Sequence, residues 1–224
     1  MNYAMIQRLI LKDWYLHRWQ ILGSLAGAAG AMAIVIFCGT AGFYIGLTLL
    51  ITVLVVVGAQ LAVASSVTER KEQTLAFIMS LPINYRDYTT AKILSNLLIF
   101  LIPWTAVSLA SAAVLLLAPG ATQGLFPFTA IMCVEILLNT CLISSVAIMT
   151  ESQMWTTTAV IVGNLAVNIV GYLIAHIHPI AAGLFGHNIA WTSAATLCLL
   201  GELAMITMLF ALTYFVQSRK PDYL

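Results

Sequence analysis

Long apolar runs dominate this sequence and restrict it to a membrane fold. Six stretches approach or exceed the roughly 20 residues that a helix needs to cross a bilayer. The runs lie at about Gln20–Cys38, Phe43–Val67, Ile93–Leu117, Phe126–Met149, Trp155–Ala175 and Ile189–Val216. Apolar residues make up 62% of the chain, more than the roughly half that soluble domains carry. The expected fold class is therefore an all-α integral membrane protein, with six transmembrane helices in a single domain over residues 1–224.

Basic residues gather on one side of the predicted membrane. All nine Lys and Arg lie in three places, which are residues 8–18, residues 70–92 between the second and third runs, and residues 219–220. The connections on the other side contain neither residue type. Because cytoplasmic loops carry the excess of Lys and Arg, we expect both termini to face the cytoplasm. A formal net charge of +1 gives no reason to expect a nucleic-acid partner.

The first 19 residues predict a separate amphipathic helix in the membrane interface. Ile6, Leu9, Ile10 and Trp14 recur at steps of three and four residues, whereas the basic residues lie on another face. The alternative is an ordinary frayed segment before the first span. The spans then occupy residues 20–66 and 93–216, with a short cytoplasmic tail at 217–224.

The connection at 67–92 is unusually polar for this chain. Its last 24 residues carry seven charged side chains. A capping-box spacing that begins at Ser66 predicts a helix start, and Leu75 and Ile78 add a short apolar stripe. Pro82 should end that helix, after which the chain restarts as one helix into the third span. This connection is the one internal cytoplasmic loop large enough to contact a partner.

A motif in this connection resembles a known transporter family. Glu69-Arg70-Lys71-Glu72-Gln73-Thr74-Leu75, then Leu81-Pro82 and Ala91-Lys92, is similar to the segment after the second span in ABC transporter permeases of the type 2 exporter family. Gln73 stands where that family usually has Gly. The resemblance implies a coupling helix that touches an ATPase. The residues it assigns to that contact are Glu69, Glu72, Thr74, Leu75, Ile78 and Pro82.

The same resemblance implies the partners. The sequence has no GxxxxGK[ST] phosphate loop, so this chain would bind no cofactor, perform no catalysis itself, and leave ATP and Mg²⁺ to two copies of a separate ABC ATPase subunit. Six helices are few for an enclosed pathway, so a second permease subunit, identical or paralogous, is expected. The implied location is the bacterial inner membrane, in contact with membrane lipid.

Polar side chains inside the apolar runs are the candidates for a translocation pathway. Glu135 and Glu202 lie within the fourth and sixth runs. Asn139 follows Glu135 by one helical turn, and Asn164 and Asn168 have the same spacing in the fifth run. Ionisable groups at membrane depth usually face a bundle interior or a wet cavity. The alternative is a protonated Glu hydrogen-bonded to a neighbouring helix.

Cysteine and histidine give weaker signals. The four cysteines lie in apolar runs without CxxC spacing and are expected to be small packing residues. His176, His178 and His187 cluster in the last outer loop, where zinc binding competes with an interfacial loop anchored by Trp191. No metal site is expected. The exporter interpretation has two rivals, which are a non-transporting membrane assembly or immunity factor and an intramembrane metalloenzyme that uses the outer histidines.

Overall fold

The computed structural model describes residues 3–37, 39–64, 85–117, 123–184, 186 and 188–219, and this part of the chain contains helices and no strand. The helices are α1 (Tyr3–Phe37), α2 (Gly39–Ala62), α5 (Tyr85–Leu117), the 3₁₀ turn η2 (Gln123–Leu125), α6 (Phe126–Thr150), α7 (Gln153–Ala175), α8 (His178–Ala181) and α9 (Ser193–Ser218). The prediction that one helix runs from the polar connection into the third span is confirmed by α5.

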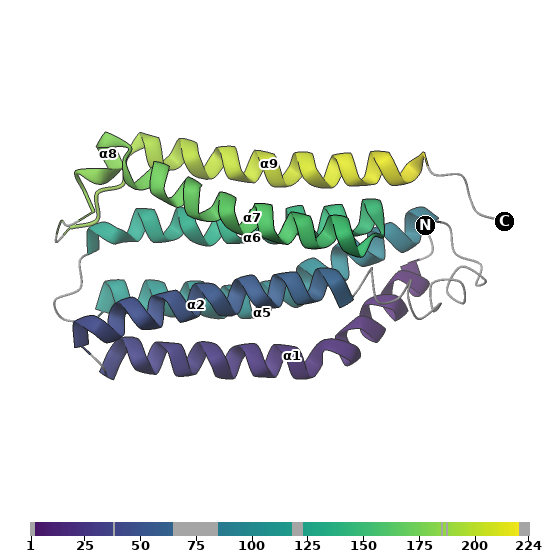
Figure 1. The fold of residues 1–224 in the computed structure, drawn as a ribbon, viewed down its shortest axis with the longest axis horizontal. Coiled ribbons are helices and arrows are strands. Elements are labelled where there is room, and N and C mark those ends of the chain that lie inside the picture. Colours follow the sequence, from purple (N-terminus) through teal and green to yellow (C-terminus); the bar gives the residue numbers. More distant parts are fainter. Residues whose placement is uncertain are drawn as a thin grey trace.

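The long helices lie side by side and alternate in direction, so that α1 begins and α9 ends at the same end of the bundle (Figure 1). Five of them, α1, α5, α6, α7 and α9, are long and apolar enough to cross a membrane. The corresponding stretch of α2, Thr48–Ala62, is shorter. The chain is therefore a helical, multi-pass membrane protein, and the sixth span stays a prediction.

The N-terminal segment differs from its prediction. It is not a separate helix, because α1 runs unbroken from Tyr3 to Phe37 and only bends in its N-terminal part (Figure 1). Its packed face includes Leu9, Asp13 and His17, whereas Trp14, assigned to the apolar face, is 41% exposed. The polar side of α1 packs inward because Asp13 pairs there with a buried cation. Hydropathy alone does not reveal such a pair.

Helix α6 lies at the centre of the bundle. Helices α2, α5, α7 and α9 all pack against it. In its most apolar 18-residue stretch 67% is buried, compared with 17–28% in the corresponding stretches of the other four candidate spans. Large side chains of α7 and α9, such as Leu165 and Met208, point outward. Such an outer surface suits lipid, so α6 is the helix whose polar residues are best shielded from the bilayer.

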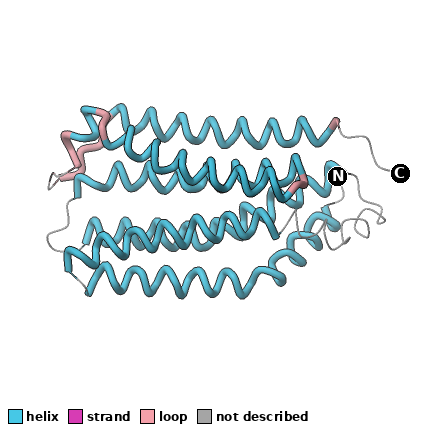
Figure 2. Tube along the Cα trace, in the orientation of Figure 1, coloured by secondary structure: helices cyan, strands magenta, loops and turns pink. Residues whose placement is uncertain are grey.

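The described loops lie at the two ends of the bundle (Figure 2). Between α6 and α7 only Glu151 and Ser152 are outside a helix. The turn is this tight because Glu151 adopts a left-handed conformation, with φ of 49°, and its N–H donates to the carbonyl of Ala147 at 2.9 Å. The connection between α6 and α7 is therefore very short.

Candidate functional site in the membrane interior

Two carboxylates meet at the interface of α6 and α9. Glu135 on α6 is 6% exposed and Glu202 on α9 is 7% exposed. Apolar clusters bracket them on both sides, one that contains Ile131 and Ala195 and one that contains Leu138 and Ile206. The two carboxylates therefore lie at a similar level of the α6–α9 interface.

This arrangement is costly unless the pair has a partner. Both oxygens of Glu202 are buried without a hydrogen bond from the described part of the chain. An ionised acidic side chain in mid-membrane costs about 3 kcal/mol even on insertion scales. Glu202 therefore is either protonated, which is the structural alternative, or paired with a group from outside the described residues, as in a polar pathway.

Asparagines extend the polar region from α6 to α7. The Asn139 side-chain amide donates to Oδ1 of Asn164 at 3.1 Å. Gly163 makes this contact feasible, since a Cβ at that position would lie 2.0 Å from Oδ1 of Asn139. Asn168 lies on the exposed side of α7, where its amide donates to the carbonyl of Asn164 at 2.7 Å. Asn168 is therefore the one predicted pathway residue that the structure leaves outside the packed interior.

The strongest polar contact of the described chain was missed by sequence analysis. The Lys92 ammonium on α5 lies 3.0 and 3.2 Å from the two carboxylate oxygens of Asp13 on α1, and both residues are buried. The Ser95 hydroxyl donates to the same carboxylate at 2.8 Å, while Lys12 lies 3.5 Å from it. We call Asp13, Lys92 and Ser95 the α1–α5 clamp.

The α1–α5 clamp contains two charged residues for which the sequence had predicted other environments. Lys92 was interpreted as part of the polar connection, and Asp13 lies in the segment that was expected to form the interfacial helix. What links the two residues is their opposite charge and not a sequence periodicity, because burying either charge in a bundle without the other is strongly unfavourable. Lys92 therefore pairs with α1 and not with the carboxylates of α6 and α9 in the described structure.

The remaining predicted sites are only partly visible. The proposed coupling residues Glu69, Glu72, Thr74, Leu75, Ile78 and Pro82 lie outside the described residues. In the connection between α7 and α9, Nδ1 of His176 lies 2.8 Å from the carbonyl of Tyr172, and His187 is again outside the described part. No group of three or more potential ligands within the described ranges is arranged to hold a metal ion.

Comparison with known proteins returns no match: no family model, no curated protein and no solved structure is similar to this chain.

Proposed function

We propose that the chain is the transmembrane subunit of an ATP-driven ABC exporter of the bacterial inner membrane. In this proposal it works with a second permease subunit and with two separate ATPase subunits that dock on residues 67–92. The observation that carries the proposal is a polar region inside an otherwise apolar bundle. Glu135 and Asn139 lie on the central helix α6, and Asn164 and Glu202 lie on the neighbouring α7 and α9. The motif-bearing connection precedes α5 in the sequence.

The arrangement of these parts suits energy coupling. A transporter needs a polar lining at membrane depth and a cytoplasmic element that an ATPase moves. The polar lining is built from α6, α7 and α9, and the connection joins α2 to α5. Because α5 packs on both α1 and α6, movement at its N-terminus would reach the helix that carries Glu135.

Co-purification tests the partner. The membrane protein should bring down a protein with a phosphate loop, and Glu72→Ala with Ile78→Ala should weaken that association while the protein stays in the membrane. Glu151→Gln, on the short connection between α6 and α7 that is expected on the same side, is the matched control. Recovery of the chain without any such ATPase from native membranes would favour the rival assembly or immunity factor.

Cysteine labelling tests the orientation. In a cysteine-free background, Asn84→Cys should react with an impermeant thiol reagent from the cytoplasmic side, and Thr122→Cys from the outer side. The prediction follows from the distribution of the nine basic residues. The reverse pattern would place residues 67–92 out of reach of a cytoplasmic ATPase and remove the proposed mechanism.

Two substitutions test the role of Glu135. Glu135→Gln keeps the shape and hydrogen-bonding capacity, whereas Glu135→Leu removes both. If the carboxylate serves transport, the Gln variant folds normally but changes export or substrate-stimulated ATPase activity. If the carboxylate is only structural, Gln behaves as wild type and Leu lowers the yield of folded protein. Normal folding and normal transport in both variants would exclude Glu135 from the pathway.

A further inference from the structure

One exposed residue of α7 does not suit a lipid environment. Asn168 is exposed and lies about two turns before the helix ends at Ala175, which places it inside the hydrocarbon layer. Its side-chain amide donates one hydrogen bond, to the carbonyl of Asn164 at 2.7 Å. Within the described part of the chain, the second N–H and the carbonyl oxygen of the Asn168 side chain have no hydrogen-bond partner.

Helix α7 cannot supply the missing partner itself. The backbone N–H groups of a helix interior already donate to carbonyls four residues earlier, so they leave no donor for an amide oxygen. Exposed threonines differ, because the single proton of the hydroxyl is donated within the helix, from Thr158 to the carbonyl of Met154 and from Thr207 to that of Ala204. Lipid chains offer no hydrogen bond at all. Asn168 therefore requires a polar group from outside the described residues.

The residues around Asn168 form a regular seam on the side of α7 that faces away from α6. Steps of four and three residues in turn pick out only exposed positions, and this spacing of 3.5 residues is that of a left-handed helix pair, the common crossing of membrane helices. The seam covers roughly 27 Å at 1.5 Å per residue, most of the hydrocarbon layer. We call it the α7 seam, and it consists of Met154, Thr158, Ile161, Leu165, Asn168 and Tyr172.

A second α7 is the helix that fits this seam. Two copies that are inserted in the same orientation and related by a two-fold axis bring each seam residue opposite its own counterpart, at the same depth. An asparagine amide carries both donors and an acceptor, so Asn168 is complementary to itself. A single asparagine among apolar seam residues also fixes the register of a helix pair.

We propose that the α7 seam packs against the same seam of a second copy of this chain, with the two Asn168 side chains hydrogen-bonded to each other across the two-fold axis. This rests on the proposed function only for the expectation of a second permease subunit. That subunit is then an identical copy, and α7 is its contact surface. Because Asn139 donates to Asn164 and Asn168 donates to the carbonyl of Asn164, a line of amides connects α6 of one copy with α6 of the other.

Disulfide cross-linking tests the contact. In a cysteine-free protein, Leu165→Cys places a thiol on the α7 seam, and Leu203→Cys on α9 is the control. Both positions are exposed and equally far from the end of the bundle that carries α8 (Figure 1). A disulfide requires two Cβ atoms to approach within about 4 Å, so copper phenanthroline in native membranes should cross-link Leu165→Cys at least about tenfold faster than Leu203→Cys. Coexpression of two differently tagged copies should give a product that carries both tags.

A second pair of variants tests the hydrogen bond between the two Asn168 side chains. Added to Leu165→Cys, Asn168→Leu should slow cross-linking severalfold, because the seam loses its only amide. Thr207→Leu is the matched control, since Thr207 is an exposed polar residue of α9 whose hydroxyl bonds within its own helix. It should leave the rate at position 165 unchanged.

Equal cross-linking rates for Leu165→Cys and Leu203→Cys would overturn the α7 contact. A product in which a tagged copy is linked to a different protein would overturn the second copy as its partner. An unchanged rate in Asn168→Leu would overturn the pairing of the two asparagines. None of these measurements requires an ATPase, so a negative result here is distinct from failed co-purification.

Discussion

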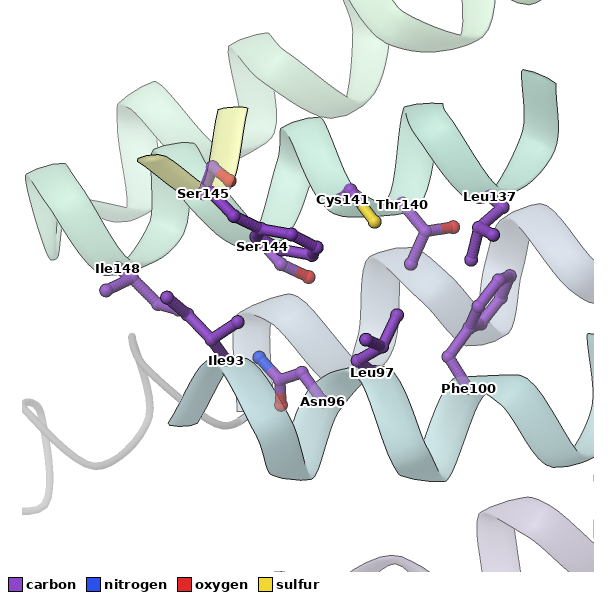
Figure 3. Close-up of a pocket in the computed structure, with 11 residues that line it drawn as sticks. Ile93, Asn96, Leu97, Phe100, Leu137, Thr140, Cys141, Ser144, Ser145 and Ile148 are labelled. Atoms are coloured by element: carbon purple, nitrogen blue, oxygen red, sulfur yellow. The ribbon is translucent and has the colours of Figure 1, made fainter. Parts of the chain in front are cut away.

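The two faces of α5 are built in opposite ways. Toward α1, Lys92 and Ser95 bond the buried carboxylate of Asp13 at 2.8–3.2 Å. Toward α6, apolar side chains such as Leu97 and Phe100 surround a cavity of about 10 Å³ (Figure 3). A buried ion pair therefore joins one face of α5 to its neighbour, whereas mainly apolar side chains form the other. The difference shows that counting polar residues inside a membrane bundle says little about rigidity until their partners are known.

The opposite side of α6 sharpens the contrast. There α7 approaches so closely that Gly163 leaves no room for a Cβ beside Asn139. Ala62, Ile143 and Ala147 complete this contact, and Val160 packs on them. Helix α6 thus has a close-packed side toward α7 and α2.

Removing the charge of Asp13 should have the largest effect on stability. Asp13→Asn leaves Lys92 buried without its counter-charge, which typically costs about 3–5 kcal/mol. Lys92→Met should cost less, because Lys12 and Ser95 still contact the carboxylate. Equilibrium unfolding in mixed detergent and SDS micelles measures both values.

The double variant Asp13→Leu with Lys92→Met is the decisive control for the clamp. Replacing both charges by apolar groups of similar volume should recover most of the lost stability. If the double variant is as unstable as Asp13→Asn, the ion pair does not account for the contact between α1 and α5. Arg18→Gln, an exposed basic position on the same helix, should be near neutral.

Adding one methyl group on the close-packed side of α6 should have the next largest effect. Gly163→Ala places a Cβ 2.0 Å from Oδ1 of Asn139 and forces the Asn139–Asn164 bond apart. Overpacking of this kind costs about 1–3 kcal/mol. Gly201→Ala on α9, where nothing lies within 4 Å of the new Cβ, should be neutral or slightly stabilising under the same unfolding assay. Equal effects at the two glycines would contradict the close packing of α6 on α7.

The smallest effect is expected at Ser145. Its hydroxyl is buried without a hydrogen-bond partner in the described part of the chain. If a bound water satisfies that hydroxyl, Ser145→Ala changes the free energy of unfolding by no more than about 0.5 kcal/mol. If no water reaches it, removing the unpaired hydroxyl should instead stabilise the protein by about 1–3 kcal/mol. The sign and size of this one value therefore distinguish a hydrated hydroxyl from an unpaired one.

Hydropathy was enough to predict the helical membrane class and the approximate helix positions. The run predicted at Phe126–Met149 is α6 at Phe126–Thr150, and the run at Trp155–Ala175 is α7 at Gln153–Ala175. These predictions succeed because length and apolarity are local properties of a membrane helix.

The contacts between helices were less predictable. Sequence analysis selected Glu135, Asn139 and Glu202 as unusual, and the structure buries all three. It could not reveal that the two carboxylates lie at a similar level of the α6–α9 interface. It also missed the bond between Asp13 and Lys92, which are separated by 79 positions. Such pairs depend on how the helices pack against one another, so they cannot be predicted from the periodicity of a single helix.

The central claim is that the buried bond between Asp13 and Lys92 holds α1 and α5 together. Electron–electron double resonance in liposomes tests it directly, with spin labels at the exposed positions Leu22 on α1 and Leu98 on α5. The account predicts a narrow distance distribution for the pair 22–98 that Asp13→Asn broadens and Arg18→Gln leaves unchanged. A distribution that stays as narrow in Asp13→Asn as in the wild type would contradict it.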